Sequence, residues 1–447
     1  MTDLVKILPI TLLSCISTIC TSEAKEKYNI ILVYCDDMGY GDLGITGNPH
    51  IKTPNIDGMA MGGIRFTNYY SASPASTASR YAMLTGRYPS RSGFDWVLDP
   101  KSPEGIHPKE YTIAEILKSQ GYKTAIYGKW HLGSTSKEYL PLQNGFDEYI
   151  GLPYSNDMIP PHYQDIALLS GNDTLEMNPN QNKLTELYTT EAISFIKKNK
   201  KNSFFIYLPY AMPHVPLHPG KNFVGTSKAG AYGDVVEEID WAIGELLETL
   251  KKEKLDRKTI VWFISDNGPW ILKKTDGGSA GLFRDGKGST WEGGVRVPCI
   301  AYCPGLISPG VNDEIVTAMD VYMTNAYLGN GVIPESHVVD GSNIASYLGF
   351  DVMPKKDDTP YFYLGVGNKL MAVRKGKWKL HIKTYSQLGI NYFGKKVPLL
   401  FDLNSDPSER YDLSCKHPEI VKDLLHLIEK NKDLLYMGVY GTDKSSK

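Results

Sequence analysis

Tyr28-Asn29-Ile30-Ile31-Leu32-Val33-Tyr34 is a continuous apolar run that ends in the polar sequence Cys35-Asp36-Asp37. An apolar run without alternation is typical of a strand that is buried on both faces of a sheet. Similar runs, each followed by polar residues, recur at Lys123–Tyr127, Phe204–Leu208 and Thr259–Ser265. These runs alternate with helical patterns, which predicts an α/β fold in which a large mixed, mainly parallel sheet is sandwiched by helices.

Three segments between these runs carry helical signals. Thr112–Ser119 begins with Glu115 placed as in a capping box, and both Leu184–Lys198 and Asp234–Lys252 have apolar residues at helical spacing. In open α/β sheets, ligands collect at the carboxyl ends of the strands. The polar residues that follow the apolar runs are therefore the first candidates for a functional site.

The pattern changes from about Thr359 onward. Short alternating runs appear, such as Lys369–Ile382, and an amphipathic helix is expected near Pro418–Leu435. We therefore expect a smaller C-terminal α+β subdomain that carries an antiparallel sheet.

The start of the chain has the pattern of an export signal. Lys6 precedes the apolar run Ile7–Ile19, which is too short to span a bilayer, and small and polar residues follow. Leu12-Leu13-Ser14-Cys15 also fits a lipoprotein processing site. We expect residues 1–24 to be the signal, with the protein in the periplasm, or on the outer membrane if Cys15 is lipidated.

The overall charge excludes two classes of partner. The chain has 447 residues, of which 48 are basic and 50 acidic, so its net charge is only -2. No bulk field attracts nucleic acid or an anionic membrane, and a lipid anchor is the only expected link to a membrane. Beyond the signal, Cys35, Cys299, Cys303 and Cys415 are too few and scattered to predict a disulfide framework.

Two strand ends offer oxygen ligands for a metal ion. Asp36 and Asp37 follow the first buried run, and Asp266 and Asn267 follow the run that ends at Ser265. Carboxylate and amide oxygens suit calcium or magnesium. A two-zinc phosphatase would be expected to have histidine at the position of Asn267, so the pattern favours a single hard cation.

The segment Ser76-Thr77-Ala78-Ser79-Arg80 leads from a polar turn into a helix, where the helix dipole favours a nucleophile and an anionic substrate. Together with Leu84-Thr85-Gly86-Arg87, it resembles the signature of the formylglycine-dependent type I sulfatases of the alkaline-phosphatase superfamily. The resemblance implies that Ser76 is oxidised to formylglycine (3-oxoalanine), whose hydrated aldehyde is the nucleophile. Serine here is either the variant that anaerobic bacterial enzymes mature or a replacement of the commoner cysteine.

Further blocks of that family follow in its order. They are Gly128-Lys129-Trp130-His131-Leu132-Gly133, Gly151–Asp157, Pro213-His214-Val215-Pro216, Gly286–Arg296 and the C-terminal Leu400–Leu403. The resemblance implies a sulfatase catalytic domain over residues 25–355 and a C-terminal subdomain over residues 356–447. Residues 225–240 resemble the branch that includes arylsulfatase A and N-acetylgalactosamine-6-sulfatase, and the member expected is one from an anaerobic gut bacterium.

The resemblance also assigns a calcium site and a nucleophile. One calcium ion would be held by Asp36, Asp37, Asp266, Asn267 and the modified Ser76. It would orient the nucleophile and polarise a sulfate oxygen. Arg80 would hold the formylglycine hydrate.

The resemblance also implies which residues bind the sulfate group and which carry out two proton transfers. Lys129 and Lys287 would clamp sulfate oxygens, and Ser155 would contact the sulfate. His214, or alternatively Lys287, would protonate the departing sugar oxygen. His131 would then take a proton from the second hydroxyl, so that the aldehyde re-forms and sulfate leaves.

The substrate implied is a sulfated sugar of the galactose or N-acetylgalactosamine type, from glycosaminoglycan or mucin glycans. A sulfatase-maturating enzyme acting on Ser76 is the implied protein partner. Loop residues near the blocks are candidates for the sugar pocket: Asp95, Trp96, Tyr154, His162, His218, Trp270 and Arg284. Two alternatives remain, namely a phosphomonoesterase or phosphodiesterase of the same superfamily, and an inactive protein that binds sulfated glycans through unconverted Ser76.

Overall fold

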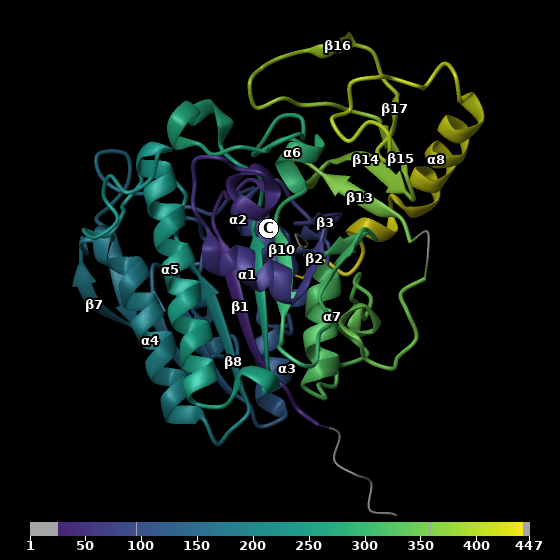
Figure 1. Ribbon diagram of the computed structural model, residues 1–447. Helices are drawn as coiled ribbons and strands as arrows, with labels where there is room; N and C mark the ends of the chain where they lie inside the picture. Colours follow the sequence, from purple (N-terminus) through teal and green to yellow (C-terminus); the bar gives the residue numbers. More distant parts are fainter. Residues whose placement is uncertain (1–25, 95, 357–358, 441–447) are drawn as a thin grey trace, which may run out of the picture.

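The computed structural model describes residues 26–94, 96–356 and 359–440 (Figure 1). The predicted export signal, with Cys15, lies outside the described residues, and so does Asp95. Within the described ranges, no helix is both long enough and apolar enough to cross a membrane.

A ten-stranded sheet forms the centre of the molecule, in the order β11-β2-β10-β9-β1-β8-β4-β5-β6-β7. Its strands are β1 Asn29–Cys35, β2 Ile64–Phe66, β4 Lys123–Tyr127, β5 Glu148–Gly151, β6 Ala167–Ser170, β7 Asp173–Met177, β8 Phe204–Pro209, β9 Thr259–Ser265, β10 Cys299–Tyr302 and β11 Gly310–Asn312. The central strands β9, β1, β8, β4 and β5 run parallel, while β10, β6 and β7 run antiparallel to their neighbours. The predicted mixed, mostly parallel sheet is confirmed.

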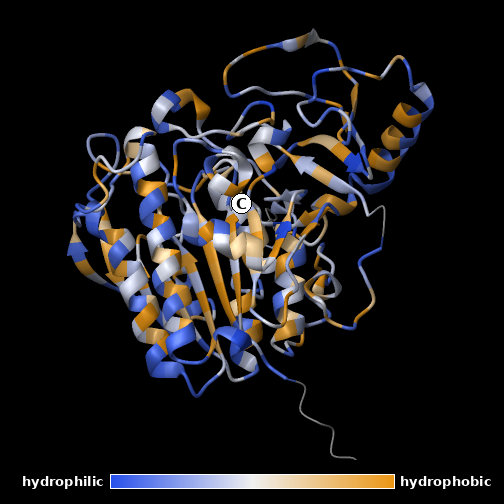
Figure 2. Ribbon diagram, viewed as in Figure 1, coloured by the Kyte–Doolittle hydropathy of each residue, from blue (hydrophilic) through white to orange (hydrophobic). Residues whose placement is uncertain are grey.

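Helices cover both faces of this sheet (Figure 1). One face carries α1 Pro54–Gly62, α4 Leu184–Asn199 and α5 Gly230–Lys252, and the other carries α2 Ser76–Thr85, α3 Ile113–Ser119 and α7 Ala318–Leu328. A hydrophobic core lies on each face of the sheet, and successive side chains of β1 point alternately into the two cores. Ile31 and Val33 pack in the core with α1, α4 and α5, and Ile30 and Leu32 pack in the core with α2, α3 and α7. The strands β1, β8 and β9 are accordingly apolar along most of their length (Figure 2).

The predicted helices form close to the expected positions. Thr112 caps α3 and exchanges hydrogen bonds with Glu115, which confirms the capping box. The helix predicted from Asp234 begins four residues earlier, at Gly230. Cys299 and Cys303 are free and buried, as expected from their spacing along a strand.

The C-terminal part forms an antiparallel sheet of four strands, as predicted. These are β13 Tyr361–Leu364, β14 Leu370–Lys375, β15 Trp378–His381 and β17 Leu399–Asp402, with β16 Tyr392–Lys395 in the long loop before β17. The helix α8 Pro418–Asn431 packs through Leu424 and Ile428 and ends four residues before the predicted boundary. Short 3-10 helices connect these elements, and the remaining strands and α-helix are the paired strands β3 Tyr69–Tyr70 and β12 Val316–Thr317 and the short helix α6 Glu292–Val295.

Buried ion pairs join the C-terminal sheet to the large sheet region. Lys379 of β15 lies 2.9 Å from a carboxylate oxygen of Glu292 in α6 and 2.9 Å from one of Glu409. Arg374 of β14 donates to the hydroxyl of Tyr70 in β3. The hydroxyl of Tyr70 in turn donates to Glu292 at 2.7 Å, so α6 is bonded both to β15 and to β3.

Candidate active site

The parallel pairing of β1 and β9 places two polar segments at the same edge of the sheet. Cys35 pairs with Ser265, so Asp36, Asp37 and Asp266 emerge side by side. The backbone N–H of Asp37 donates to Asp266 Oδ1 at 3.0 Å. Asp37 has a φ of 67°, a conformation that aspartate tolerates better than most side chains. The expected meeting of the two strand ends is observed.

The start of α2 brings Ser76 to this edge. Its hydroxyl donates to Asp36 Oδ1 at 3.0 Å and lies 3.5 Å from Asn267 Oδ1. The amide nitrogen of Asn267 is engaged with Asp37 Oδ1 at 2.7 Å, which leaves the amide oxygen facing Ser76. Ser76 is thus a buried hydroxyl at the positive end of a ten-residue helix, in contact with both strand ends.

Arg80 lies one helical turn after Ser76 and is completely buried. Its guanidinium contacts Asp266 Oδ2 at 3.0 Å and Asp36 Oδ2 at 3.6 Å, and it donates to the carbonyl oxygen of Lys129 at 3.1 Å. The same side chain therefore ties α2 to β1, to β9 and to the segment after β4.

Two lysines from different segments of the chain contact the carboxylates of Asp36 and Asp37. Lys129 contacts Asp36 Oδ2 and donates to Ser155 Oγ at 3.0 Å, and burial lowers its pKa although Asp36 opposes this. Lys287 lies 2.8 Å from Asp37 Oδ2. Burial tends to lower the pKa of Lys287, but the Asp37 and Asp36 carboxylates outweigh this and raise it. Two ammonium groups are thus available near Ser76 for an anionic substrate.

Two histidines complete the ring of polar groups, and burial lowers the pKa of both. His131 Nε2 lies 2.8 Å from the carbonyl oxygen of Leu98, so this nitrogen carries the proton of the neutral ring. His131 Nδ1 is buried and has no hydrogen-bond partner among the described residues. His214 Nδ1 lies 2.5 Å from the carbonyl oxygen of Val215, and His214 Nε2 lies 3.6 Å from Asp37 Oδ2.

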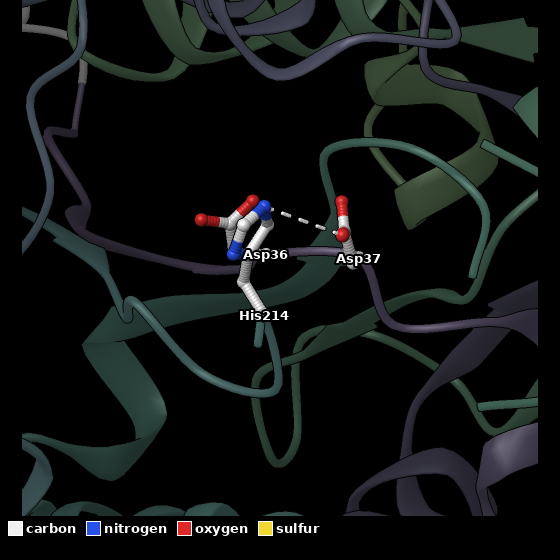
Figure 3. Close-up of side chains that lie close together, drawn as sticks. All are labelled: Asp36, Asp37 and His214. Atoms are coloured by element: carbon white, nitrogen blue, oxygen red, sulfur yellow. Dashed lines mark ion pairs between the residues drawn. The ribbon is translucent and has the colours of Figure 1, made fainter. Parts of the chain in front are cut away.

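The oxygen atoms at the two strand ends fit a hard divalent cation. Ligand atoms of Asp36, Asp37 and His214 lie within 4.8 Å of one another, and the two carboxylates and the imidazole converge in Figure 3. Around Ser76 Oγ the donors are a carboxylate and an amide oxygen, which are the ligand types of calcium. His214 is the only nitrogen ligand of this group among the described residues, whereas zinc sites are usually rich in nitrogen or sulfur ligands.

A cavity of about 390 Å³ opens above Ser76. Of the residues predicted for the site, Ser76, His131, Ser155, His214 and Lys287 line this cavity. Arg80, Lys129 and the carboxylates Asp36, Asp37 and Asp266 are buried with the Asn267 amide around Ser76. The sequence-predicted site residues are therefore brought together in one place.

The candidates for the sugar pocket divide into two groups. Trp96 and Trp270 line the cavity. Tyr154 is buried and donates to the carbonyl oxygen of Asp165, and the guanidinium of Arg284 stacks 4.2 Å from the ring of Tyr392. Neither these two residues nor His162 and His218 are among the residues that line it.

The sequence analysis missed other residues of the cavity wall, among them Asp157, Tyr163, Tyr385 and Gln387. Asp157 belongs to the recognised block around Ser155, so its position was available from that pattern. Tyr385 and Gln387 come from a loop of the C-terminal part that has no periodic pattern.

Comparison with known proteins agrees with this arrangement. Residues 28–330 match the sulfatase family, and residues 355–438 match the C-terminal region of aryl-sulfatase. The chain is 35% identical to N-acetylgalactosamine-6-sulfatase of Homo sapiens, over 93% of this chain and 87% of that protein. It is 36% identical to arylsulfatase A of Bos taurus, over 91% of this chain and 87% of that protein.

Solved structures show the same fold. One comes from work on the metabolism of multiple glycosaminoglycans by Bacteroides thetaiotaomicron, and it superposes with a TM-score of 0.80 at 28% identity. The match covers 91% of this chain and all of that one. The sequence, the fold and the cluster around Ser76 together show that the chain belongs to the sulfatase family and is a sulfuric ester hydrolase.

Proposed function

We propose that the enzyme removes O-sulfate from a galactose- or N-acetylgalactosamine-type sugar of glycosaminoglycan or mucin glycans, through a formylglycine derived from Ser76. The observation that carries the proposal is the placement of Ser76 at the start of α2, against Asp36 and Asn267 and at the base of a cavity. The sugar class is supported by the relative named N-acetylgalactosamine-6-sulfatase.

Formylglycine, as its hydrate, would supply one hydroxyl to attack the sulfur and a second through which sulfate is released. The chain's own residues hold the reacting groups. Lys129 and Lys287 present ammonium groups to sulfate oxygens, where negative charge must be stabilised in the transition state. Arg80, fixed by Asp266, sets the orientation of the first turn of α2.

His131 is placed to act as a base. Its Nε2 proton is held by Leu98, so the free electron pair lies on Nδ1, which has no partner among the described residues. We propose that Nδ1 takes the proton from the hydroxyl that remains on residue 76. Neutral histidine is the form this step needs, and the lowered pKa of His131 favours it.

We propose that His214 protonates the departing sugar oxygen. Nδ1 of His214 donates to the carbonyl oxygen of Val215, so Nε2 on the cavity wall carries a proton to give only when the ring is charged. Burial lowers the pKa of His214 and opposes this charged form, while the Asp37 carboxylate, 3.6 Å from Nε2, favours it. Lys287 is the alternative donor, because its ammonium group lies on the same wall.

One calcium ion is the proposed cofactor, held by Asp36, Asp37, Asp266, Asn267 and residue 76. It would supply positive charge that polarises a sulfate oxygen. The elemental content of the purified protein tests this: one calcium per chain supports the proposal, and two zinc ions would support a phosphatase of the same superfamily.

Expression with and without an anaerobic sulfatase-maturating enzyme tests the proposed function. We expect release of sulfate from 4-nitrophenyl sulfate and from sulfated galactose-type sugars only after maturation. No release from either preparation, combined with tight binding of sulfated sugars, would instead identify a glycan-binding protein.

We also propose that the enzyme is exported, because the first residues have the pattern of an export signal. Fractionation of the producing cells tests this, with the mature enzyme expected in the periplasm. Recovery in outer membranes as a lipidated protein would identify Cys15 as the anchor, and recovery of an uncleaved chain in the cytoplasm would contradict export.

A further inference from the structure

A second cavity, of about 480 Å³, lies beside the one above Ser76. Tyr385 lines both cavities, so the two adjoin across its side chain. Residues of the long loop around β16 line the second cavity together with Trp291 at the start of α6, and Figure 1 shows the path of this loop. Its volume falls within the range of about 300–1,000 Å³ that is usual for ligand pockets.

Aromatic side chains that pack against one another form one wall of this cavity. The ring of Trp291, at the start of α6, lies 5.7 Å from the ring of Tyr392 and 6.1 Å from that of Phe393. The guanidinium of Arg284 lies 4.2 Å from the ring of Tyr392 and 5.2 Å from that of Trp291, and it donates to the carbonyl oxygen of Ser408. These contacts hold the loop in place, so the cavity exists before any ligand arrives.

The loop is also fixed to the catalytic segment. Gln387 donates to the carbonyl oxygen of Lys287 at 2.7 Å and accepts from the backbone N–H of Leu272 at 3.2 Å. A Cβ atom at Gly288 would lie 3.7 Å from the ring of Tyr385. The loop that carries Tyr385, the residue shared by the two cavities, is therefore fixed to the segment that lines the cavity above Ser76.

The chemistry of the lining matches a charged sugar. Aromatic rings alternate with the polar side chains of Thr384 and Asn391, a combination that can both pack against a sugar ring and bond to its hydroxyls. Lys383 is exposed on the rim, and it forms no ion pair with any residue that the structure describes. An uncompensated ammonium group favours an anionic neighbour.

We propose that this cavity is a second sugar subsite, which binds the residue next to the sulfated one and prefers a residue that carries a carboxylate or a sulfate. The inference rests on the proposed function, since it takes the cavity above Ser76 as the place of the sulfated sugar. The enzyme would then act on glycan chains in preference to single sugars.

The ratio of kcat/KM for two substrates tests the subsite. One is a sulfated monosaccharide, and the other is a tetrasaccharide with the same sulfated terminal residue and a uronic acid beside it. We expect a ratio of about ten or more in favour of the tetrasaccharide for the matured enzyme, which is the gain from about 1.4 kcal/mol of added binding. A ratio near one would overturn the proposal.

Two variants and a control test whether the preference for the tetrasaccharide depends on the second cavity. Lys383→Gln should lower the ratio about fivefold, the upper range for one exposed ion pair. Asn391→Trp, which fills the cavity, should bring the ratio close to one. Lys422→Gln, at an exposed position on α8, should keep the ratio of the unaltered enzyme. Equal ratios in all four proteins would contradict the assignment.

Binding measurements separate this proposal from the proposed function. The tetrasaccharide is titrated calorimetrically into the Ser76→Ala protein, with and without Asn391→Trp. If the matured enzyme releases no sulfate from either the monosaccharide or the tetrasaccharide, the proposed function fails. The subsite is then judged by binding alone: weaker binding with Asn391→Trp supports it, and unchanged binding overturns it.

Discussion

At the scale of single residues, the site is built around the Asp36 carboxylate. Ser76 and Arg80 reach it from α2, and Lys129 reaches it from the segment that follows β4. The sequence predicts these residues because they occur in ordered blocks at strand ends. It does not predict their partners, such as the carbonyl oxygen of Leu98 that fixes the tautomer of His131. That contact depends on a loop whose path no local pattern specifies.

The role of His214 predicts a dependence on the leaving group. A nitrophenolate departs without a proton, whereas a sugar alkoxide requires one. His214→Ala should therefore lower kcat for a sulfated sugar by about 10²–10⁴-fold and lower kcat for 4-nitrophenyl sulfate much less. Steady-state kinetics with both substrates make the comparison. Equal losses would argue against proton donation by His214 and favour Lys287 as the donor.

The role of His131 predicts that its removal traps an intermediate. In His131→Ala the matured enzyme should release about one equivalent of alcohol product in a burst and then turn over slowly, because no base frees the sulfate. Mass spectrometry of the quenched enzyme should show the covalently sulfated peptide that contains residue 76. His426→Ala, at an exposed position on α8, is the matched control. A variant that shows neither burst nor adduct would remove His131 from this step.

At the scale of elements, apolar runs predict the central strands to within a residue because these strands are buried on both faces. The observed start of α5 differs from the predicted one for an identifiable reason. Asp234 was expected to begin the helix, but its carboxylate accepts from the backbone N–H groups of Gly225 and Ser227. It therefore holds the preceding loop, and the helix extends back to Gly230.

Glu238 of α5 predicts a dependence of stability on pH. Burial raises its pKa from 4.5 to about 7, although the backbone N–H of Gly220 donates to it. Between these two values the unfolded chain loses this proton and the folded chain keeps it, so the contribution to stability falls as pH rises. Each unit of difference corresponds to about 1.4 kcal/mol.

Glu238→Gln removes this titration and keeps an acceptor for Gly220. The variant should therefore gain stability relative to the unaltered protein as pH rises from 5 to 7, measured by urea unfolding at each pH. A difference in stability that does not change with pH would show that the carboxyl group is already ionised in the folded protein.

At the scale of the whole molecule, the C-terminal part contributes residues to the wall of the cavity above Ser76. Its sheet was predictable from short alternating runs, and the family blocks predicted the residues of the candidate site. The contribution of Tyr385 and Gln387 to the cavity was not predictable. Both lie far from Ser76 in the sequence, in a loop whose position depends on packing against Trp291 and Lys287.

The buried ion pairs of Lys379 predict strong coupling between the two parts. Lys379→Met leaves Glu292 and Glu409 buried without this cation, which should cost about 3–5 kcal/mol. The midpoint of thermal unfolding should fall clearly. Lys377→Met removes an exposed lysine paired with Asp402 and should have little effect. Equal midpoints for the two variants would show that the buried cluster does not stabilise the fold.

The most direct measurement is the rate of sulfate release as a function of the fraction of Ser76 converted to formylglycine. Preparations matured to different extents are assayed on one sulfated sugar, and mass spectrometry of the peptide that contains residue 76 gives the converted fraction. The rate per chain should rise in proportion to that fraction and extrapolate to zero when every chain retains serine. Repeated turnovers by a preparation that holds only unmodified Ser76 would contradict the mechanism.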